Sequence, residues 1–408
     1  MARTLLFLGL LGLASLATAD VGTVTFVESV PLGTEAYLDL PDLPQAPDVW
    51  LDLVRGARTS LDIFSFYVSP DPDRPGPLRA VLDAAEARAR DGVEVRLLID
   101  AKFARTYPET HERWSALPHM QSRLLDCEDV WGSGVLHAKG MIIDGRRFFL
   151  GSQNWDWRAL VHIHELGVVV EQHDLAADLE RIYAVDWAYA GGEEIPPLAD
   201  DVSDVPDFAP VRRLALPDGR VCDAVLAASP PRALPAGVPW DLPLLIDQID
   251  NATTRVRLQM LSYNPGERDG GYWDVLDAAL RRADARGCEV QIILSNWSKR
   301  HFMVPYIKSL SVLPHTEVRF TNIPEWSGGF IPFARVEHAK YVTCDGQAVW
   351  LGTSNGSRDY FEQSRNISLF LRGAGAADAA DRFFEASWLS PYAETVDACA
   401  EYEPPRRQ

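Results

Sequence analysis

A short pattern of five positions occurs twice in this chain, about two hundred residues apart. In each copy a lysine follows a histidine by two residues, an aspartate follows that histidine by 7 residues, and an asparagine follows it by 17 residues. Five spaced positions rarely recur by chance, so the pattern predicts a duplicated chain in which both halves contribute to one site. The copies are His137-Ala138-Lys139 with Asp144 and Gly151-Ser152-Gln153-Asn154, and His338-Ala339-Lys340 with Asp345 and Gly352-Thr353-Ser354-Asn355.

The similarity between the halves extends beyond this pattern. Residues 59–63 correspond to 254–258, and residues 92–98 correspond to 287–293. Helical and β-rich segments alternate in each half, which predicts an α/β fold of two tandem α-β-α sandwich domains, each with a largely buried sheet. We expect the first domain at 20–200, a linker rich in proline and aspartate at 201–217, and the second domain at 218–408.

The N-terminus has the features of a secretory signal peptide. Arg3 precedes an apolar run from Leu5 to Leu16, and Ala17-Thr18-Ala19 supplies the small residues that a signal peptidase reads. We therefore expect residues 1–19 to be removed and the mature chain to be secreted or otherwise extracytoplasmic. No later stretch reaches 18 apolar residues, so no transmembrane segment is expected.

The charge balance limits how the chain meets its partners. The formal net charge is −19, and it becomes −20 when the signal peptide is lost with Arg3. An acidic surface argues against bulk electrostatic capture of nucleic acid or anionic lipid, but it allows a local cationic site. Only five of the 39 basic residues are lysines, and two of the five, Lys139 and Lys340, belong to the repeated pattern. We infer that a compact ammonium group is needed there.

Each repeated pattern begins on a predicted strand. Residues 136–144 alternate in character, so His137 and Lys139 share one face and lie about 6.6 Å apart at a rise of about 3.3 Å per residue. The following Asp-Gly dipeptides predict hairpin turns, and we assign Asp144 and Asp345 a structural role. A single such strand is usually only surface, whereas two matched copies indicate a site. Two imidazoles, two ammonium groups and two carboxamides suit an anionic phosphate.

A carboxylate and a carboxamide occupy matching positions after the pattern. Glu165 follows Asn154 by 11 residues and could fix the tautomer of a catalytic imidazole, while the same offset in the second half gives Asn366. Because an amide cannot stabilise an imidazolium by charge, the two histidines are expected to differ in basicity. The run His162-Ile163-His164-Glu165 also allows a metal-cluster interpretation, but the chemistry needs no ion. We therefore expect no metal and no cofactor.

These groups predict phosphodiester hydrolysis through a covalent intermediate. One neutral imidazole attacks phosphorus and forms a phosphohistidine, while the other donates a proton to the leaving oxygen and then activates water. The two lysines and two asparagines hold the non-bridging oxygens, and these four side chains are Lys139, Lys340, Asn154 and Asn355.

At these residues the chain resembles the phospholipase D superfamily, whose signature HxKx4Dx6GSxN matches both copies except that Thr353 replaces serine. Residues 27–31, 134–137, 165–169 and 334–338 resemble the branch that contains the animal endolysosomal five-prime exonucleases and the poxvirus envelope phospholipase-like proteins. The resemblance implies two phospholipase D-like domains related by pseudo-twofold symmetry, and metal-independent phosphodiester cleavage. It makes either histidine the nucleophile, and we favour His137. The implied site residues are His137, Lys139, Asn154, His338, Lys340 and Asn355.

The branch acts on single-stranded DNA and RNA, and lipid transphosphatidylation is also associated with it. A secreted 5′ exonuclease is therefore our first hypothesis, with Trp155, Arg335, Tyr360 and Phe361 as substrate contacts, although core packing is the alternative for the aromatic side chains. The second is a phospholipase D that hydrolyses or transphosphatidylates glycerophospholipids, for which no basic amphipathic helix offers a membrane surface. The third, an inactive phosphate-binding module, is disfavoured because both copies retain every motif residue. The oligomeric state is left open.

Overall fold

A computed structural model of the chain describes residues 21–71, 73, 76–200, 202, 208–267 and 270–407. The expected signal peptide at 1–19 lies outside these residues, as does part of the expected linker. Within the described ranges, no helix has both the length and the apolar character that crossing a bilayer would require.

The predicted alternation of helices and strands is confirmed in both halves. The first half comprises β1 (Val21–Ser29), α1 (Glu35–Leu38), α2 (Ala46–Arg55), β2 (Ser60–Ser65), β3 (Val68–Ser69), α3 (Pro77–Arg90), β4 (Glu94–Asp100), α4 (Ala101–Ala104), α5 (Glu109–Ser115), β5 (Met120–Leu125), α6 (Cys127–Trp131), β6 (Gly140–Ile143), β7 (Arg147–Gly151), β8 (Trp155–Asp156), α7 (Trp157–Val161), β9 (Glu165–Glu171) and α8 (His173–Gly191). The second half comprises β10 (Arg212–Ala215), β11 (Val221–Ser229), η1 (Pro231–Ala233), α9 (Asp241–Asp250), β12 (Arg255–Met260), α10 (Val275–Ala285), β13 (Glu289–Ser295), η2 (Asn296–Ser298), α11 (Val304–Ser311), β14 (Thr316–Thr321), β15 (Tyr341–Cys344), β16 (Ala348–Gly352), α12 (Arg358–Glu362), β17 (Asn366–Arg372), α13 (Asp378–Leu389) and β18 (Ala393–Thr395).

One 16-stranded sheet runs through both halves. Read outward from β10, the order is β1-β9-β7-β6-β2-β4-β5 on one side and β11-β17-β16-β15-β12-β13-β14 on the other, with β18 at the far edge. Corresponding strands follow in the same order, which is the arrangement that two repeats related by a pseudo-twofold axis produce. The central strand β10 pairs in parallel with β1 and antiparallel with β11. Residues 212–215 fall within the expected linker, but they form this strand. Its residue Leu214 is buried where the strand pairs with β1 and β11.

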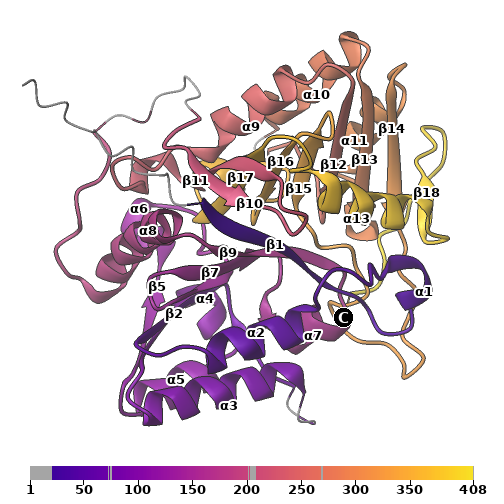
Figure 1. The fold of residues 1–408 in the computed structure, drawn as a ribbon. Coiled ribbons are helices and arrows are strands. Elements are labelled where there is room, and N and C mark those ends of the chain that lie inside the picture. Colours follow the sequence, from indigo (N-terminus) through magenta and orange to yellow (C-terminus); the bar gives the residue numbers. More distant parts are fainter. Residues whose placement is uncertain are drawn as a thin grey trace, which may run out of the picture.

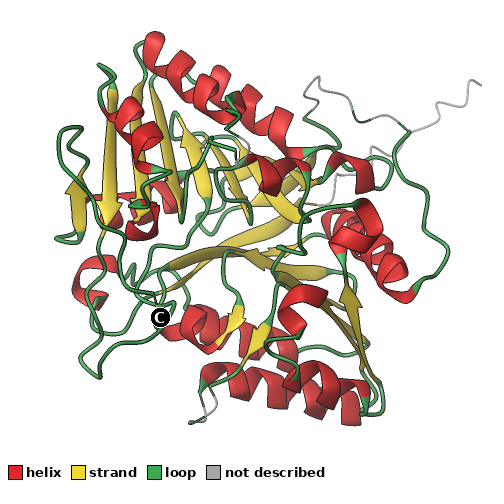
Figure 2. Cartoon of the chain, turned by 180° about the vertical axis from the view of Figure 1, so that it is seen from behind, coloured by secondary structure: helices red, strands yellow, loops and turns green. Residues whose placement is uncertain are grey.

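Helices cover the sheet at both ends of the molecule. In the first half α2 and α3 lie side by side on one side of the sheet (Figure 1). They bury a stripe at helical spacing that includes Trp50, Leu78 and Leu82, and this stripe packs on β2 and β4. In the second half α9 and α10 do the same with residues such as Leu245 and Leu276. Seen from behind, the strands lie between these two groups of helices (Figure 2).

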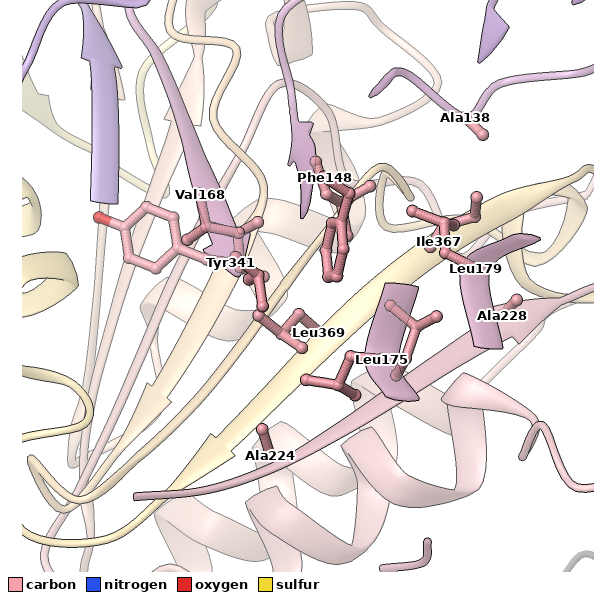
Figure 3. Packing of buried hydrophobic residues seen from close by; sticks show 14 of the residues in the cluster. Ala138, Phe148, Val168, Leu175, Leu179, Ala224, Ala228, Tyr341, Ile367 and Leu369 are labelled. Atoms are coloured by element: carbon pink, nitrogen blue, oxygen red, sulfur yellow. The ribbon is translucent and has the colours of Figure 1, made fainter. Parts of the chain in front are cut away.

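A third core lies between the halves. The strand residue Phe148 of the first half packs in one cluster with Leu369 of the second, and Leu175 of α8 packs in the same cluster beside Ala224 of β11 (Figure 3). Helix α13 contributes Phe383 to this cluster. Each fully buried side chain of this size stabilises the fold by roughly 1.5–3 kcal/mol, so the shared core holds the halves together.

The strands of the two repeated patterns are shorter than the sequence predicts. Both hairpins form with the expected Asp-Gly turns, whose aspartate and glycine have positive φ angles, and three residues separate the paired strand ends in each hairpin. However, β6 begins only at Gly140 and β15 only at Tyr341. The preceding segments pair with the opposite half instead, because Leu136 bridges to Arg365 and Glu337 bridges to His164.

Candidate active site

Each motif histidine lies where its chain segment pairs with the residue that precedes β17 or β9 of the opposite half. The His137 backbone N–H donates to the Arg365 carbonyl at 2.9 Å, and the His338 N–H donates to the His164 carbonyl at 2.9 Å. Residue 365 directly precedes β17 and residue 164 directly precedes β9. The two histidines are therefore presented at the boundary between the halves, where each electrostatically influences the other half's groups.

The side-chain partners of the two histidines are exchanged between the halves. His338 Nδ1 lies 2.7 Å from Glu165 Oε2, and His137 Nδ1 lies 3.1 Å from Asn366 Oδ1. Glu165 and Asn366 are fully buried and begin the equivalent strands β9 and β17. Each histidine is thus oriented by a residue that lies far away in sequence and belongs to the other repeat.

The hydrogen bonds of Asn366 determine the tautomer of His137. Its Nδ2 donates to the Tyr360 carbonyl at 2.7 Å, so its Oδ1 must face His137 and Thr353, whose hydroxyl donates to it at 2.9 Å. An amide oxygen only accepts, so His137 donates from Nδ1 and keeps the lone pair of a neutral ring on Nε2. The threonine that departs from the family signature therefore supports the histidine of the other half.

The pKa values of the two imidazoles reflect burial and different partners. Burial lowers the pKa of His137 well below its usual value, and the charges of Lys139 and Lys340 lower it further. Burial also lowers the pKa of His338, but the Glu165 carboxylate opposes this effect. His137 is consequently the neutral ring, and His338 is the one whose imidazolium a carboxylate can stabilise.

Two buried lysines face the same boundary. Lys139 and Lys340 are at most 1% exposed, and each Nζ donates to the backbone carbonyl of the histidine two residues before it. Burial lowers the pKa of Lys340 to about 7, and burial together with the Lys340 charge lowers the pKa of Lys139 well below its usual value. Two buried ammonium groups, of which Lys340 opposes the ionisation of Lys139, favour a bound anion.

The motif asparagines are also buried at the site. Asn154 is 7% exposed and Asn355 is 1% exposed. Among the described residues, nothing forms a hydrogen bond with Oδ1 of either side chain. Because buried polar atoms are normally paired, these amides retain bonding capacity for a bound group such as a phosphoryl oxygen.

Partly buried aromatic rings surround and extend from His137. The rings of Tyr360 and Phe66 lie 4.8 Å and 5.1 Å from the imidazole, both near perpendicular. Phe66 contacts Phe103 at 3.9 Å, and Tyr67 stacks between Phe103 and Tyr107. Sequence reasoning identified Tyr360 but missed the other four rings, although Phe66 directly follows the carboxyl end of a parallel strand, where α/β sites form.

Three of the expected substrate contacts lie elsewhere. Trp155 is fully buried against Trp50 at 4.8 Å, and Phe361 is fully buried in the core of the second half, so the packing alternative is correct for both. Arg335 is also buried, and its guanidinium donates to the carbonyls of Leu32 and Pro324. Arg335 thereby links the loop that contains Leu32 to the loop that contains Pro324.

The expected structural aspartates lie at the hairpin turns. Asp144 accepts hydrogen bonds from the backbone N–H groups of residues 58–60, and Asp345 accepts from those of residues 253–255. These bonds lower the pKa of both carboxyls. The metal interpretation of residues 162–165 has no support in the described part of the chain, where no group of three or more metal-ligating side chains assembles.

Two repeats of one strand order that bring paired histidines and lysines to a common boundary define a phospholipase D-type phosphodiesterase. The chain belongs to the phospholipase D superfamily: the family model described as "Cardiolipin synthase, PLD-like domain" matches residues 51–187 and 245–388, once in each half.

Similar proteins support the same family. The chain is 32% identical over 417 residues to "5'-3' exonuclease PLD3" of Homo sapiens, covering 94% of this chain and 82% of that protein. It is 28% identical over 394 residues to "Phospholipase D Z" of Dictyostelium discoideum, covering 92% and 91%. The phosphatidylserine synthase of Haemophilus influenzae Rd KW20 shares the fold with a TM-score of 0.59 and 13% identity, covering 86% of this chain and 85% of that one.

Proposed function

We propose that this protein cleaves phosphodiesters through a phosphohistidine formed on His137. The observation that carries the proposal is the exchanged pairing: a neutral histidine oriented by Asn366 and a histidine stabilised by Glu165 lie at one boundary with two buried lysines. A nucleophile needs a free lone pair, whereas a general acid needs a proton, and the two partners favour these different states.

The reaction takes two displacements. Nε2 of His137 attacks phosphorus and forms a P–N bond while the P–O bond to the leaving group breaks, and His338 transfers its proton to the leaving oxygen. Neutral His338 then takes a proton from water, the water oxygen attacks phosphorus, and the P–N bond breaks to restore His137. Lys139 and Lys340 hold the non-bridging oxygens, together with the amides of Asn154 and Asn355.

The proposed substrate is the 5′ end of single-stranded DNA or RNA. Partly buried rings next to His137 retain some exposed surface on which bases can stack, and this supports a nucleic-acid substrate. The similar human protein that bears the name of a 5′-3′ exonuclease supports it as well. Phospholipase D activity is the alternative, which the name of the Dictyostelium relative supports.

A substrate comparison in EDTA tests the proposal. The purified protein is incubated with 5′-hydroxyl single-stranded DNA and, separately, with phosphatidylcholine vesicles. We expect stepwise nucleotide release from the DNA that EDTA does not abolish. Choline release without nucleotide release would instead identify the phospholipase, and complete inhibition by EDTA would contradict the metal-independent mechanism.

Variants of the two histidines test the assignment of roles. His137→Ala and His338→Ala are each expected to lower kcat by at least about a thousandfold, because each ring takes part in both displacements. With a phosphodiester whose leaving group needs no proton, His338→Ala should accumulate a phosphohistidine that mass spectrometry locates at His137. A phosphohistidine at His338 in the His137→Ala variant would reverse the two roles.

We also propose that the chain is exported and that 20–200 and 218–408 are its two domains. The apolar run after Arg3 and the small residues at 17–19 support cleavage after residue 19. N-terminal sequencing of the protein from a secreting host tests the cleavage, since a mature chain that begins at Met1 would contradict it.

A further inference from the structure

A second histidine–glutamate pair lies behind the pair that orients His338. His164 and Glu337 are the sequence neighbours of Glu165 and His338, and in extended backbone neighbouring side chains point to opposite sides. His164 Nδ1 lies 2.8 Å from Glu337 Oε2, and both side chains are at most 1% exposed. The two pairs therefore lie on opposite sides of one strand crossing.

Elements from both halves surround this second pair. From α13, the Ser387 hydroxyl lies 3.2 Å from Glu337 Oε2, and the Phe383 ring stacks on His164 at 4.1 Å. The other charged groups that act on His164 are Glu165 on its own strand and Glu28 on β1. Glu28 also accepts hydrogen bonds from the backbone of Leu40 and the side chain of Gln45. Glu337 is therefore the carboxylate that His164 contacts, while Glu28 and Glu165 act on it through their charges.

The equivalent crossing behind His137 has no titratable pair of this kind. Arg365 takes the place of His164, and its guanidinium binds Asp186 through two hydrogen bonds of 2.8 Å. Leu136 takes the place of Glu337, and the strand registers put Ala228 in the place of Glu28. A guanidinium keeps its charge at any pH where the protein is folded, whereas an imidazole loses its charge near neutrality.

We propose that His164 is a positioning residue whose protonated pair with Glu337 fixes the crossing that presents His338 to Glu165, and that the crossing loosens when His164 loses its proton. This inference rests on the proposed function of His338. The mechanical link is short, because the His338 backbone N–H donates to the carbonyl of His164 itself. A shift of one strand against the other would therefore displace the general acid from its carboxylate.

The direction of the pH effect follows from the surroundings of His164. Burial alone would lower its pKa, but the charge and hydrogen bond of Glu337 outweigh burial, so the pKa of His164 is raised above its usual value. Because the pKa of His164 is raised in the folded state, the pair stabilises the fold fully at pH values below the unfolded-state pKa of about 6.5. This stabilisation is lost as the pH rises through the folded-state pKa. The site is therefore fixed firmly under acid conditions.

Three variants and one matched control test this role. His164→Gln and Glu337→Gln each leave one buried partner unpaired, while the double variant makes a neutral amide pair of similar size. His119→Gln is the control, because His119 and Glu94 form a pair of the same 2.8 Å length that is about half exposed at the surface. Turnover of a thymidine dinucleotide, whose alkoxide leaving group needs the proton that His338 supplies, is measured as a function of pH, together with the Nδ1–H proton resonance of His338 in histidine-labelled protein.

We expect His164→Gln to lower kcat about tenfold to a hundredfold at acid pH with little change in KM, because the general acid is misplaced. The deficit should shrink as pH rises, since the wild-type protein itself loses the His164 proton there. The double variant should recover most of the acid-pH activity and exceed the wild-type protein at higher pH. The control should match the wild-type protein throughout.

A deficit that is constant with pH in every folded variant would reduce His164 to a packing residue and overturn the inference. If His164→Gln does not fold, the kcat of the double variant divided by the kcat of the wild-type protein still tests the inference, because this ratio must rise with pH. If the wild-type protein turns over no phosphodiester, the proposed function fails, and the resonance decides the positioning role separately. The Nδ1–H resonance of His338 should persist in the wild-type protein at acid pH and should shift in Glu337→Gln. An unshifted resonance in that variant would overturn the inference.

Discussion

At the scale of single residues, one substitution between the repeats gives the two histidines different chemistry. Glu165 and Asn366 occupy equivalent strand positions and bind the histidine of the opposite half. A carboxylate stabilises an imidazolium by charge, whereas the amide of Asn366 only fixes a tautomer. This difference between the repeats fits the proposed roles of one proton donor and one nucleophile.

Glu165→Gln should lower kcat by about a hundredfold and move the pH optimum to lower values. Removing the carboxylate removes the effect that opposes burial at His338, so the pKa of His338 falls and less of the acid is protonated at a given pH. A pH–rate profile measures both effects. Asn366→Asp is the counterpart, which should raise the pKa of His137 and remove activity on the acid side, and an unchanged optimum in both variants would contradict the assignment.

The two lysines should take up protons when an anion binds. Because burial lowers the pKa of Lys340 to about 7, part of the free protein carries it neutral at pH 7.5, and a phosphate analogue such as vanadate would restore its charge. Calorimetric titration in two buffers of different ionisation enthalpy counts the protons. Lys340→Met should lower this count, and identical heats in both buffers would contradict the expected uptake.

At the scale of elements, each hairpin is anchored to the start of the neighbouring strand, β2 or β12, by its turn aspartate. Asp345 bonds three successive backbone N–H groups and two hydroxyls at residues 253–255, where β12 begins. The hairpin is the element that follows Lys340 directly, so this anchor holds the catalytic segment against β12. Asp345 therefore affects the site indirectly, by holding the hairpin that follows Lys340 against β12.

Asp345→Ala should lower the free energy of unfolding by about 2 kcal/mol, because three backbone N–H groups and two hydroxyls lose a charged acceptor. The bonded N–H groups lower the pKa of Asp345, so its contribution is present above the unfolded value of about 3.9 and is lost as pH falls through the folded value. Urea unfolding at pH 7 measures the change. A loss below about 0.5 kcal/mol, typical of a surface substitution, would contradict this role.

At the scale of the whole molecule, the halves cannot be separated without dismantling the site. One sheet and one apolar core span both, and each histidine has its backbone and side-chain partners in the other half. The buried pair of Arg365 with Asp186 connects β17 to α8 in the same way. Assembly of the halves and assembly of the site are therefore one event.

Asp186→Asn should lower the free energy of unfolding by about 3 kcal/mol, because it leaves the fully buried Arg365 guanidinium without its counter-ion. Activity should fall as well, since the Arg365 carbonyl accepts from the His137 backbone. Urea unfolding monitored by fluorescence and a turnover assay measure the two effects. Asp218→Asn, which affects a half-exposed ion pair with Arg220, is the control and should change neither quantity.

The repeated spacing of histidine, lysine and asparagine predicted the duplication, and the alternation of helical and β-rich segments predicted the α/β class, because these properties follow from local periodicity and from the recurrence of whole segments. Glu165 and Asn366 were also recognised as partners of the imidazoles. The local Asp-Gly signal correctly placed both hairpin turns. Such features depend on residues that lie close together in the chain.

The tertiary structure alone decided which side chains reach which. Trp155 and Phe361 lie in the core because helices packed over them, and Arg335 is buried under loops; no local pattern distinguishes these positions from exposed ones. The exchange of Glu165 and Asn366 between the halves, and the pair of His164 with Glu337, depend on strands that are 173 or more residues apart. Contacts across that separation are set by packing of the two repeats, because chain proximity contributes nothing to them.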